Sequence, residues 1–138
     1  MFTKLSHIGI MVNDIEKAKK SWTETFGLKV SPTRVVAVEG LKQAFLSIGD
    51  SFIELIEPID HQDMGNMVAK RLATRGEGIF HIALIVDDIT KVAKELTTKG
   101  LEVIKRPPTS DQPQGRLILH PKSTNGALLE LMSRELTQ

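Results

Sequence analysis

The chain has 138 residues, and 18 lysines and arginines against 17 aspartates and glutamates give it a formal net charge of +1. A near-neutral chain with five Phe, one Trp, no Tyr and no Cys offers no nucleic-acid-binding surface, disulfide framework or thiolate nucleophile. This length suits one domain over residues 1–138, and because no apolar run could span a bilayer, we expect a cytoplasmic protein without membrane contact.

The first part of the chain predicts a strand, a helix and three further strands. Apolar and polar residues alternate over 4–12, which is typical of a strand. Asn13 or Asp14 then supplies the N-cap of a helical stripe that ends at Gly27. Three extended segments are expected next, near 28–38, 41–48 and 51–57.

The later part of the chain predicts the same succession after a short connecting helix. The apolar face of that connecting helix consists of Met64, Met67, Val68 and Leu72. A strand over 79–86 then precedes a helix near 88–98. Short strands are expected near 101–105, 116–120 and 126–132, interrupted by a loop rich in proline and polar residues from Arg106 to Gly115.

The two parts are copies of one unit. His7-Ile-Gly-Ile-Met-Val corresponds to His81-Ile-Ala-Leu-Ile-Val, and Phe52-Ile-Glu54 corresponds to Leu128-Leu-Glu130. We infer two tandem βαβββ modules, with a linker helix within about 59–77 between them. Module 1 covers about 4–58 and module 2 about 78–133. One helix per module beside mostly antiparallel strands gives an α+β class.

Four potential metal ligands repeat with these modules. His7 and His81 lie on the first strands, and Glu54 and Glu130 lie on the last. Each Glu shares its strand face with apolar residues, where a carboxylate is costly unless it is paired or bound to a metal. Two imidazoles and two carboxylates suit Zn²⁺, Ni²⁺, Co²⁺, Mn²⁺ or Fe²⁺. We predict one curved mixed sheet around a metal site; the alternative is hydrogen-bonded core histidines and solvated glutamates.

Several other polar residues are weaker site candidates. Gln43 lies between apolar residues of its strand face and is expected to line the cavity. His120 precedes Lys122 and Ser123 in a segment that fits either a substrate-contacting loop or an ordinary turn. Arg116 and Lys122 are candidates for contact with an anion, although most surface cations are only solvated.

Paired βαβββ modules with His on the first strand and Glu on the last resemble the vicinal oxygen chelate (glyoxalase/bleomycin resistance/dioxygenase) superfamily. Within that superfamily the chain most resembles the methylmalonyl-CoA epimerases, and the similarity covers nearly the whole chain. The matching segments are His7-Ile-Gly-Ile-Met-Val, Ala44-Phe-Leu-Ser-Ile-Gly, Ile53-Glu-Leu-Ile-Glu-Pro58, Arg75-Gly-Glu-Gly-Ile-Phe-His-Ile82 and Leu119-His-Pro-Lys-Ser-Thr-Asn-Gly126. The Gly-Glu-Gly and His-Pro-Lys-Ser segments are the ones typical of the epimerase-like branch.

The resemblance implies a site and a reaction. The four predicted ligands would hold a divalent ion (Co, Zn, Ni, Mn or Mg) that chelates a 2-substituted malonyl-CoA thioester, and Glu130 would remove its α-proton. The segment from His120 through Lys122 and Ser123 would bind the substrate. Some members carry a second catalytic Glu where this chain has Gln43, and an amide cannot act as that base.

The resemblance also implies a homodimer, and it leaves two other functions open. One is a glyoxalase I-like isomerisation of a glutathione hemithioacetal, the lactoylglutathione lyase reaction. The other is a non-catalytic module that binds small molecules. The repeated ligand set favours the enzymes over the binding module.

Overall fold

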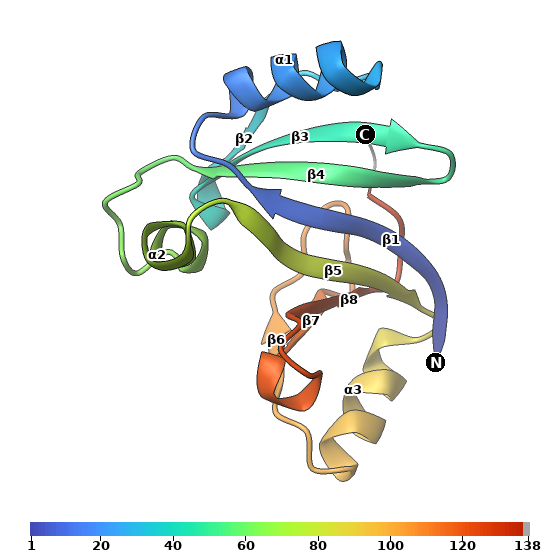
Figure 1. Cartoon of the computed structure of the whole chain (residues 1–138). Helices are drawn as coiled ribbons and strands as arrows, with labels where there is room; N and C mark the ends of the chain where they lie inside the picture. Colours follow the sequence, from blue (N-terminus) through green and yellow to red (C-terminus); the bar gives the residue numbers. More distant parts are fainter. Residues whose placement is uncertain (137–138) are drawn as a thin grey trace. The chain divides into compact units, whose positions relative to one another are not determined.

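The computed structural model of the protein describes residues 1–136 (Figure 1). Its elements are β1 (Phe2–Met11), α1 (Ile15–Phe26), β2 (Arg34–Val36), the 3₁₀ turn η1 (Ala37–Glu39), β3 (Leu41–Ile48), β4 (Ser51–Pro58), α2 (Met67–Arg75), β5 (Gly78–Val86), α3 (Ile89–Thr98), β6 (Val103–Arg106), β7 (Arg116–Leu119), the 3₁₀ turn η2 (Pro121–Ser123) and β8 (Leu129–Met132). The succession of one strand, one helix and three strands occurs twice, with α2 between. The predicted α+β class is therefore confirmed.

The strands form one mixed sheet, with β5 and β8 parallel and β3 and β4 antiparallel. In hydrogen-bonding order they run β2-β3-β4-β1-β5-β8-β7-β6. The chain divides into two compact units, which we describe separately: unit 1 contains residues 1–7 and the chain from His81 onward, and unit 2 contains residues 8–80. Among the described residues, no helix is both long and apolar enough to cross a membrane.

In unit 2, α1 packs on one face of β3 and β4 (Figure 1). The helix begins after Asp14, whose carboxylate accepts from the Lys17 N–H, and it ends at Gly27 in the left-handed conformation (φ +68°). The apolar side chains between helix and strands include Ile15, Trp22, Ala44, Leu46 and Leu55. Because side chains alternate along a strand, the intervening residues of β3 and β4 lie on the opposite face.

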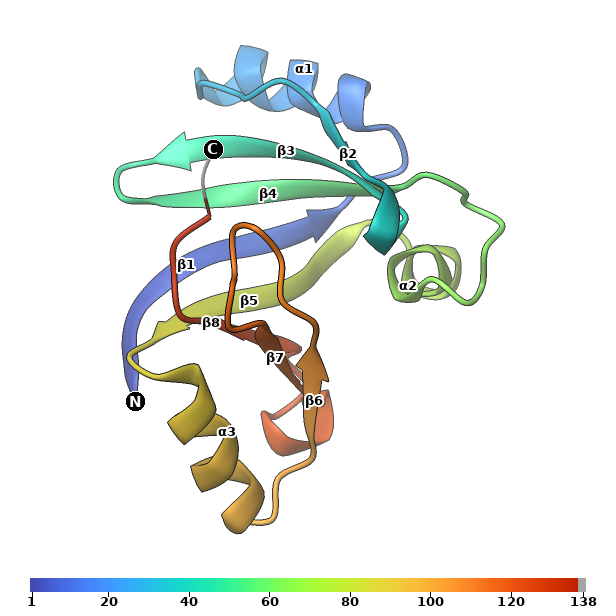
Figure 2. The ribbon, with the colours of Figure 1, turned by 180° about the vertical axis from the view of Figure 1, so that it is seen from behind.

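In unit 1, α3 packs against β6, β7 and β8 (Figure 2). The predicted helical stripe is buried in full and consists of Ile89, Val92, Ala93 and Leu96. Leu117 and Leu131 are opposite one another on β7 and β8, and both pack in this α3 core. The neighbouring residues Arg116 and Glu130 therefore lie on the other face of these strands.

Three predicted elements differ from the structure. The strand expected over 28–38 is reduced to β2, because Pro32 provides no N–H for a ladder and the chain before it makes only an isolated bridge at Val30. The connecting helix starts at Met67, since a turn at Asp63 precedes Asn66, which caps the helix. The last strand starts at Leu129 rather than 126, because the preceding segment forms a turn with positive φ at Asn125 and Gly126.

Candidate active site

Two buried histidines of unit 1 meet ring to ring. His7 lies on β1 and His81 on β5, and they are 1% and 6% exposed. Their Nε2 atoms are 3.0 Å apart, and the rings meet edge-on with centroids 5.1 Å apart. The Ser6 hydroxyl lies 3.0 Å from His7 Nδ1, so this serine holds the ring with Nε2 directed at His81.

The distance between the two Nε2 atoms fits two ligands of one metal ion. Histidine nitrogens lie about 2.0–2.1 Å from an ion such as zinc, so two ligands at right angles are separated by about 3 Å. In the protein alone, the same distance corresponds to an N–H of one ring donating to the other ring. A hydrogen-bonding partner on the second ring nitrogen, as Ser6 provides for His7, is typical of metal-binding histidines. The donor chemistry therefore fits a divalent ion.

Glu130 lies on the same face of unit 1 as His81. Strands β5 and β8 are parallel with Ala83 opposite Glu130, and Ala83 is two residues after His81, so the three side chains share a face. The Glu130 carboxylate is buried, and its Oε1 lies 3.5 Å from Arg116 Nη1. This guanidinium compensates the buried charge and orients the carboxylate.

In unit 2, Glu54 is the end of a chain of polar side chains across three strands. Gln43 of β3 donates from Nε2 to Glu54 Oε2 over 2.9 Å, and its Oε1 accepts from Arg34 Nε over 3.2 Å. Gln43 and Glu54 are 8% and 3% exposed. The Arg34 guanidinium also lies over the Phe45 ring, 4.9 Å from its centroid. Gln43 is thus buried, and its amide is fixed by a cation on one side and a carboxylate on the other, while its place in a substrate cavity stays a prediction.

The substrate-binding residues predicted after β7 lie on the turn η2 of unit 1. His120 caps this turn, because its Nδ1 accepts from the Lys122 N–H over 3.1 Å. Lys122 and Ser123 are exposed on the turn. These contacts give His120 a local role, and the part of all three residues in substrate binding stays a prediction.

The geometry adds side-chain contacts at the site that sequence patterns did not predict. Ser6 holds His7, Arg34 holds Gln43, and Arg116 pairs with Glu130. Arg116 was a candidate for an anion, but its carboxylate partner depends on the pairing of β7 with β8. His7, His81 and Glu130 belong to unit 1 and Glu54 to unit 2. The convergence of all four ligands on one ion therefore remains a prediction.

Comparison with known proteins gives consistent matches over most of the chain. A family model described as Glyoxalase/Bleomycin resistance protein/Dioxygenase superfamily matches residues 6–119. The ethylmalonyl-CoA/methylmalonyl-CoA epimerase of Cereibacter sphaeroides is 31% identical over 134 residues, which cover 95% of this chain and 98% of the relative.

Solved structures of epimerases match the fold as well. A Glu-to-Gln variant of the Streptomyces coelicolor methylmalonyl-CoA epimerase, in complex with 2-nitronate-propionyl-CoA, has a TM-score of 0.81 and 33% identity, covering 95% of this chain and 96% of that chain. A methylmalonyl-CoA epimerase in complex with methylmalonyl-CoA and NH4+ has a TM-score of 0.82 and 30% identity, covering 99% and 100%. The chain belongs to the glyoxalase/bleomycin resistance protein/dioxygenase superfamily, and methylmalonyl-CoA epimerases are among its homologues.

Proposed function

We propose that this protein removes and replaces the α-proton of a 2-substituted malonyl-CoA thioester, and that His7, His81, Glu54 and Glu130 hold a divalent metal ion for this reaction. The observation that carries the proposal is the buried histidine pair with its Nε2 atoms 3.0 Å apart. The names of the epimerase relatives and the acyl-CoA complexes of the solved epimerases support the substrate class. A homodimer, implied by the resemblance, and a location in the cytoplasm, expected from the sequence, stay predictions.

A divalent ion at this site would supply Lewis-acid polarisation of the thioester carbonyl, which makes the adjacent C–H bond more acidic. The chain itself supplies the base. Glu130 is a buried carboxylate whose Oε1 is held by Arg116, and we assign the α-proton to its Oε2. General-base catalysis requires a positioned carboxylate, because a base can remove a proton only when it lies within hydrogen-bond distance of it.

Inversion also requires a proton donor on the opposite face of the substrate. Gln43 is unsuited to that role, because an amide does not titrate near neutral pH and both ends of this one are engaged, by Arg34 and by Glu54. We therefore assign the second proton to water or to another side chain. Because this donor is less well placed, we expect reprotonation from that face to be slower than removal of the α-proton by Glu130.

Deuterium exchange followed by chiral analysis tests this proposal. In D₂O the protein should incorporate deuterium at C2 of methylmalonyl-CoA, and incorporation should exceed inversion. Glu130→Gln should reduce the exchange by about 10²-fold or more, as expected for loss of a general base. Glu135→Gln is the matched control, since Glu135 is a more exposed carboxylate of unit 1 that pairs with Lys4.

Three outcomes would contradict parts of the proposal. Turnover of a glutathione hemithioacetal without exchange on any malonyl thioester would assign the lactoylglutathione lyase reaction instead. Binding of small molecules without either reaction would assign a non-catalytic module. Inversion as fast as exchange in the parent protein would show that Gln43 does not mark a missing proton donor.

A further inference from the structure

We propose that a basic cleft on unit 1 binds the phosphate-bearing nucleotide end of a coenzyme A thioester. The inference rests on the proposed function and deepens it, because it assigns a second contact region to the same substrate. The cleft has a volume of about 740 Å³ and lies between α3, the strands β6 and β7, and the start and end of the loop that joins these strands. This volume lies within the range of small-molecule sites.

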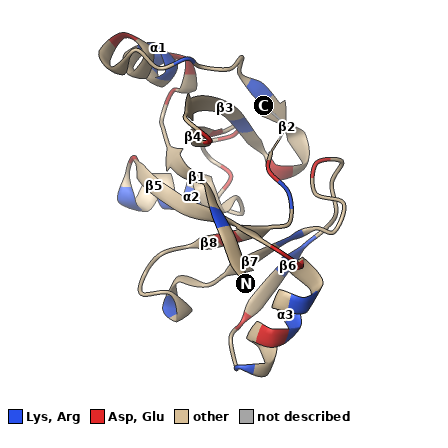
Figure 3. Ribbon diagram, turned by 90° about the vertical axis from the view of Figure 1, so that its right-hand side faces the viewer, with Lys and Arg blue, Asp and Glu red and all other residues tan. Residues whose placement is uncertain are grey.

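The lining of the cleft concentrates positive charge. It includes Lys94, Lys105, Arg106 and Arg116 and contains no aspartate or glutamate, whereas the whole chain has a formal net charge of only +1. Figure 3 shows Lys and Arg on α3 and near β6. Like charges around one cleft repel each other and raise the local concentration of anions. The charge therefore favours an anionic ligand.

Most of these cations lack a carboxylate partner in the part of the chain that the structure describes. Over residues 1–136, the structure gives no ion pair to Lys94, Lys105 or Arg106. Arg116 differs, because it pairs with Glu130. Lys94 and Lys105 thus remain for a ligand on the α3 face, and Arg106 adds an unneutralised charge at the edge of the cleft.

The strand pairing connects the cleft with the proposed base. Lys105 is opposite Leu117, which packs under α3, so Lys105 lies on the α3 face of the β6–β7 pair. Arg106 is opposite Arg116, which reaches Glu130 on the other face. Gly115 closes the loop beside them with φ +79°, where any Cβ would lie 2.4 Å from the Arg106 carbonyl oxygen. Cations therefore extend from the α3 cleft around the end of the strands to Glu130.

The chemistry of the lining favours a nucleotide bearing phosphates over a simple anion. Lysine and arginine bind phosphate oxygens, and Pro107 and Pro108 add apolar surface for a base. Coenzyme A carries a pyrophosphate and a 3′-phosphate at the end remote from its thioester. Glutathione, the thiol of the alternative reaction, has no phosphate. The cleft can therefore bind the nucleotide of a coenzyme A thioester. A glutathione hemithioacetal has no phosphate group for it to bind.

Paired substrates and paired variants test the cleft. The double variant Lys94→Gln, Lys105→Gln should raise KM for methylmalonyl-CoA by about tenfold, the sum expected for two partly screened ion contacts. The effect should appear in KM rather than kcat, and KM for methylmalonyl-pantetheine, which lacks the nucleotide, should not change. The control variant Lys91→Gln, Lys99→Gln removes the same charge from α3 and its C-cap outside the cleft, and it should behave like the parent.

Equal KM values for methylmalonyl-CoA in both double variants would overturn the proposal. An equal rise for the pantetheine thioester would also overturn it, because the lysines would then act on the reacting end. If no thioester exchanges its α-proton, the proposed function fails, and calorimetric titration with adenosine 3′,5′-bisphosphate still tests the cleft. Binding to the parent that weakens in Lys94→Gln, Lys105→Gln supports the nucleotide site, whereas no binding, or equally tight binding of inorganic phosphate, overturns it.

Discussion

At the scale of single residues, the orientation of one amide is decided by its two neighbours. Turning the Gln43 amide over would place its NH₂ against the Arg34 guanidinium and its oxygen against the Glu54 carboxylate, which exchanges two attractive contacts for two repulsive ones. Hydrogen bonds to charged groups contribute roughly 1.5–3 kcal/mol each. Arg34 therefore fixes the orientation of the Gln43 amide, and the amide in turn orients the Glu54 carboxylate.

Substitution of Arg34 tests this arrangement. Arg34→Met keeps a long apolar side chain near Phe45 but removes the Nε donor. Because the Gln43 amide would then be held on one side only, by Glu54, Co²⁺ affinity should fall about tenfold, the size of effect expected when a partner of a metal ligand is lost. The visible absorption spectrum of the Co²⁺-loaded protein should change as well. Titration with Co²⁺ measures both quantities.

Arg71→Met is the matched control, because Arg71 also lies over a phenylalanine in unit 2, 5.2 Å from the centroid of the Phe80 ring. It should lower thermal stability by a similar amount while leaving the Co²⁺ affinity and spectrum unchanged. Identical Co²⁺ titrations of Arg34→Met and the parent would show that Glu54 keeps its position without this chain of contacts.

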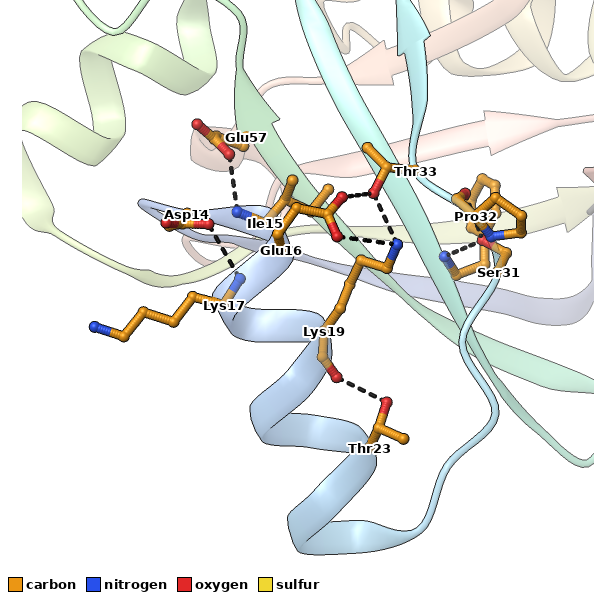
Figure 4. Close-up of polar contacts among 11 residues, drawn as sticks. Asp14, Ile15, Glu16, Lys17, Lys19, Thr23, Ser31, Pro32, Thr33 and Glu57 are labelled. Atoms are coloured by element: carbon orange, nitrogen blue, oxygen red, sulfur yellow. Dashed lines mark hydrogen bonds and ion pairs between the residues drawn. The ribbon is translucent and has the colours of Figure 1, made fainter.

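At the scale of elements, two carboxylates fix the start of α1 (Figure 4). Asp14 accepts from the Lys17 N–H, and Glu57 of β4 accepts from the Ile15 N–H over 2.8 Å. His61 Nε2 lies 2.8 Å from the other Glu57 oxygen. Farther along, the Thr33 hydroxyl donates to Glu16 and lowers the pKa of its carboxyl group. Negative charge at the first turn is attracted to the partial positive charge of the helix N-terminus, and this attraction stabilises the helix.

Glu57→Gln should lower the free energy of unfolding by about 1–2 kcal/mol, because a partly buried charge at the helix start is lost. Glu24→Gln removes an exposed carboxylate of α1, which lies 4.0 Å from Lys20, and should cost less than about 0.5 kcal/mol. Urea unfolding of the two variants and the parent gives both values. A smaller loss of unfolding free energy for Glu57→Gln than for Glu24→Gln would show that Asp14 alone stabilises the start of α1.

Elements with a strong periodicity could be predicted from the sequence, and contacts between strands could not. The helix expected near 88–98 is α3 almost residue for residue, because its apolar stripe meets the core at every turn. The strand expected near 28–38 has its apolar residues interrupted at Pro32, so its pairing with β3 decides its length. The internal repeat identifies the two histidines as candidate site residues. Arg34 and Arg116 contact their partners because of the strand register, which one sequence does not reveal.

At the scale of the whole molecule, we predict that ligands from both units bind one ion. An ion bound at one thousand times its Kd stabilises a protein by roughly 4 kcal/mol, so Tm should rise with metal concentration. His81→Ala should abolish most of this rise, and Glu54→Ala should reduce it. Calorimetry with matched metal analysis measures both effects. Full metal occupancy in a His7→Ala, His81→Ala double variant would contradict the assignment of the histidines.

The division of the chain also has a consequence for how the protein emerges from the ribosome. Unit 2 is continuous from residue 8 to residue 80, so every contact within it involves residues that are made before the rest of unit 1 is translated. Unit 1 combines residues 1–7 with the chain after His81, and this pairing closes over a long sequence separation, which slows folding. His7 thus precedes all of unit 2 in the chain, yet its surroundings are complete only after His81 and β8 have been made.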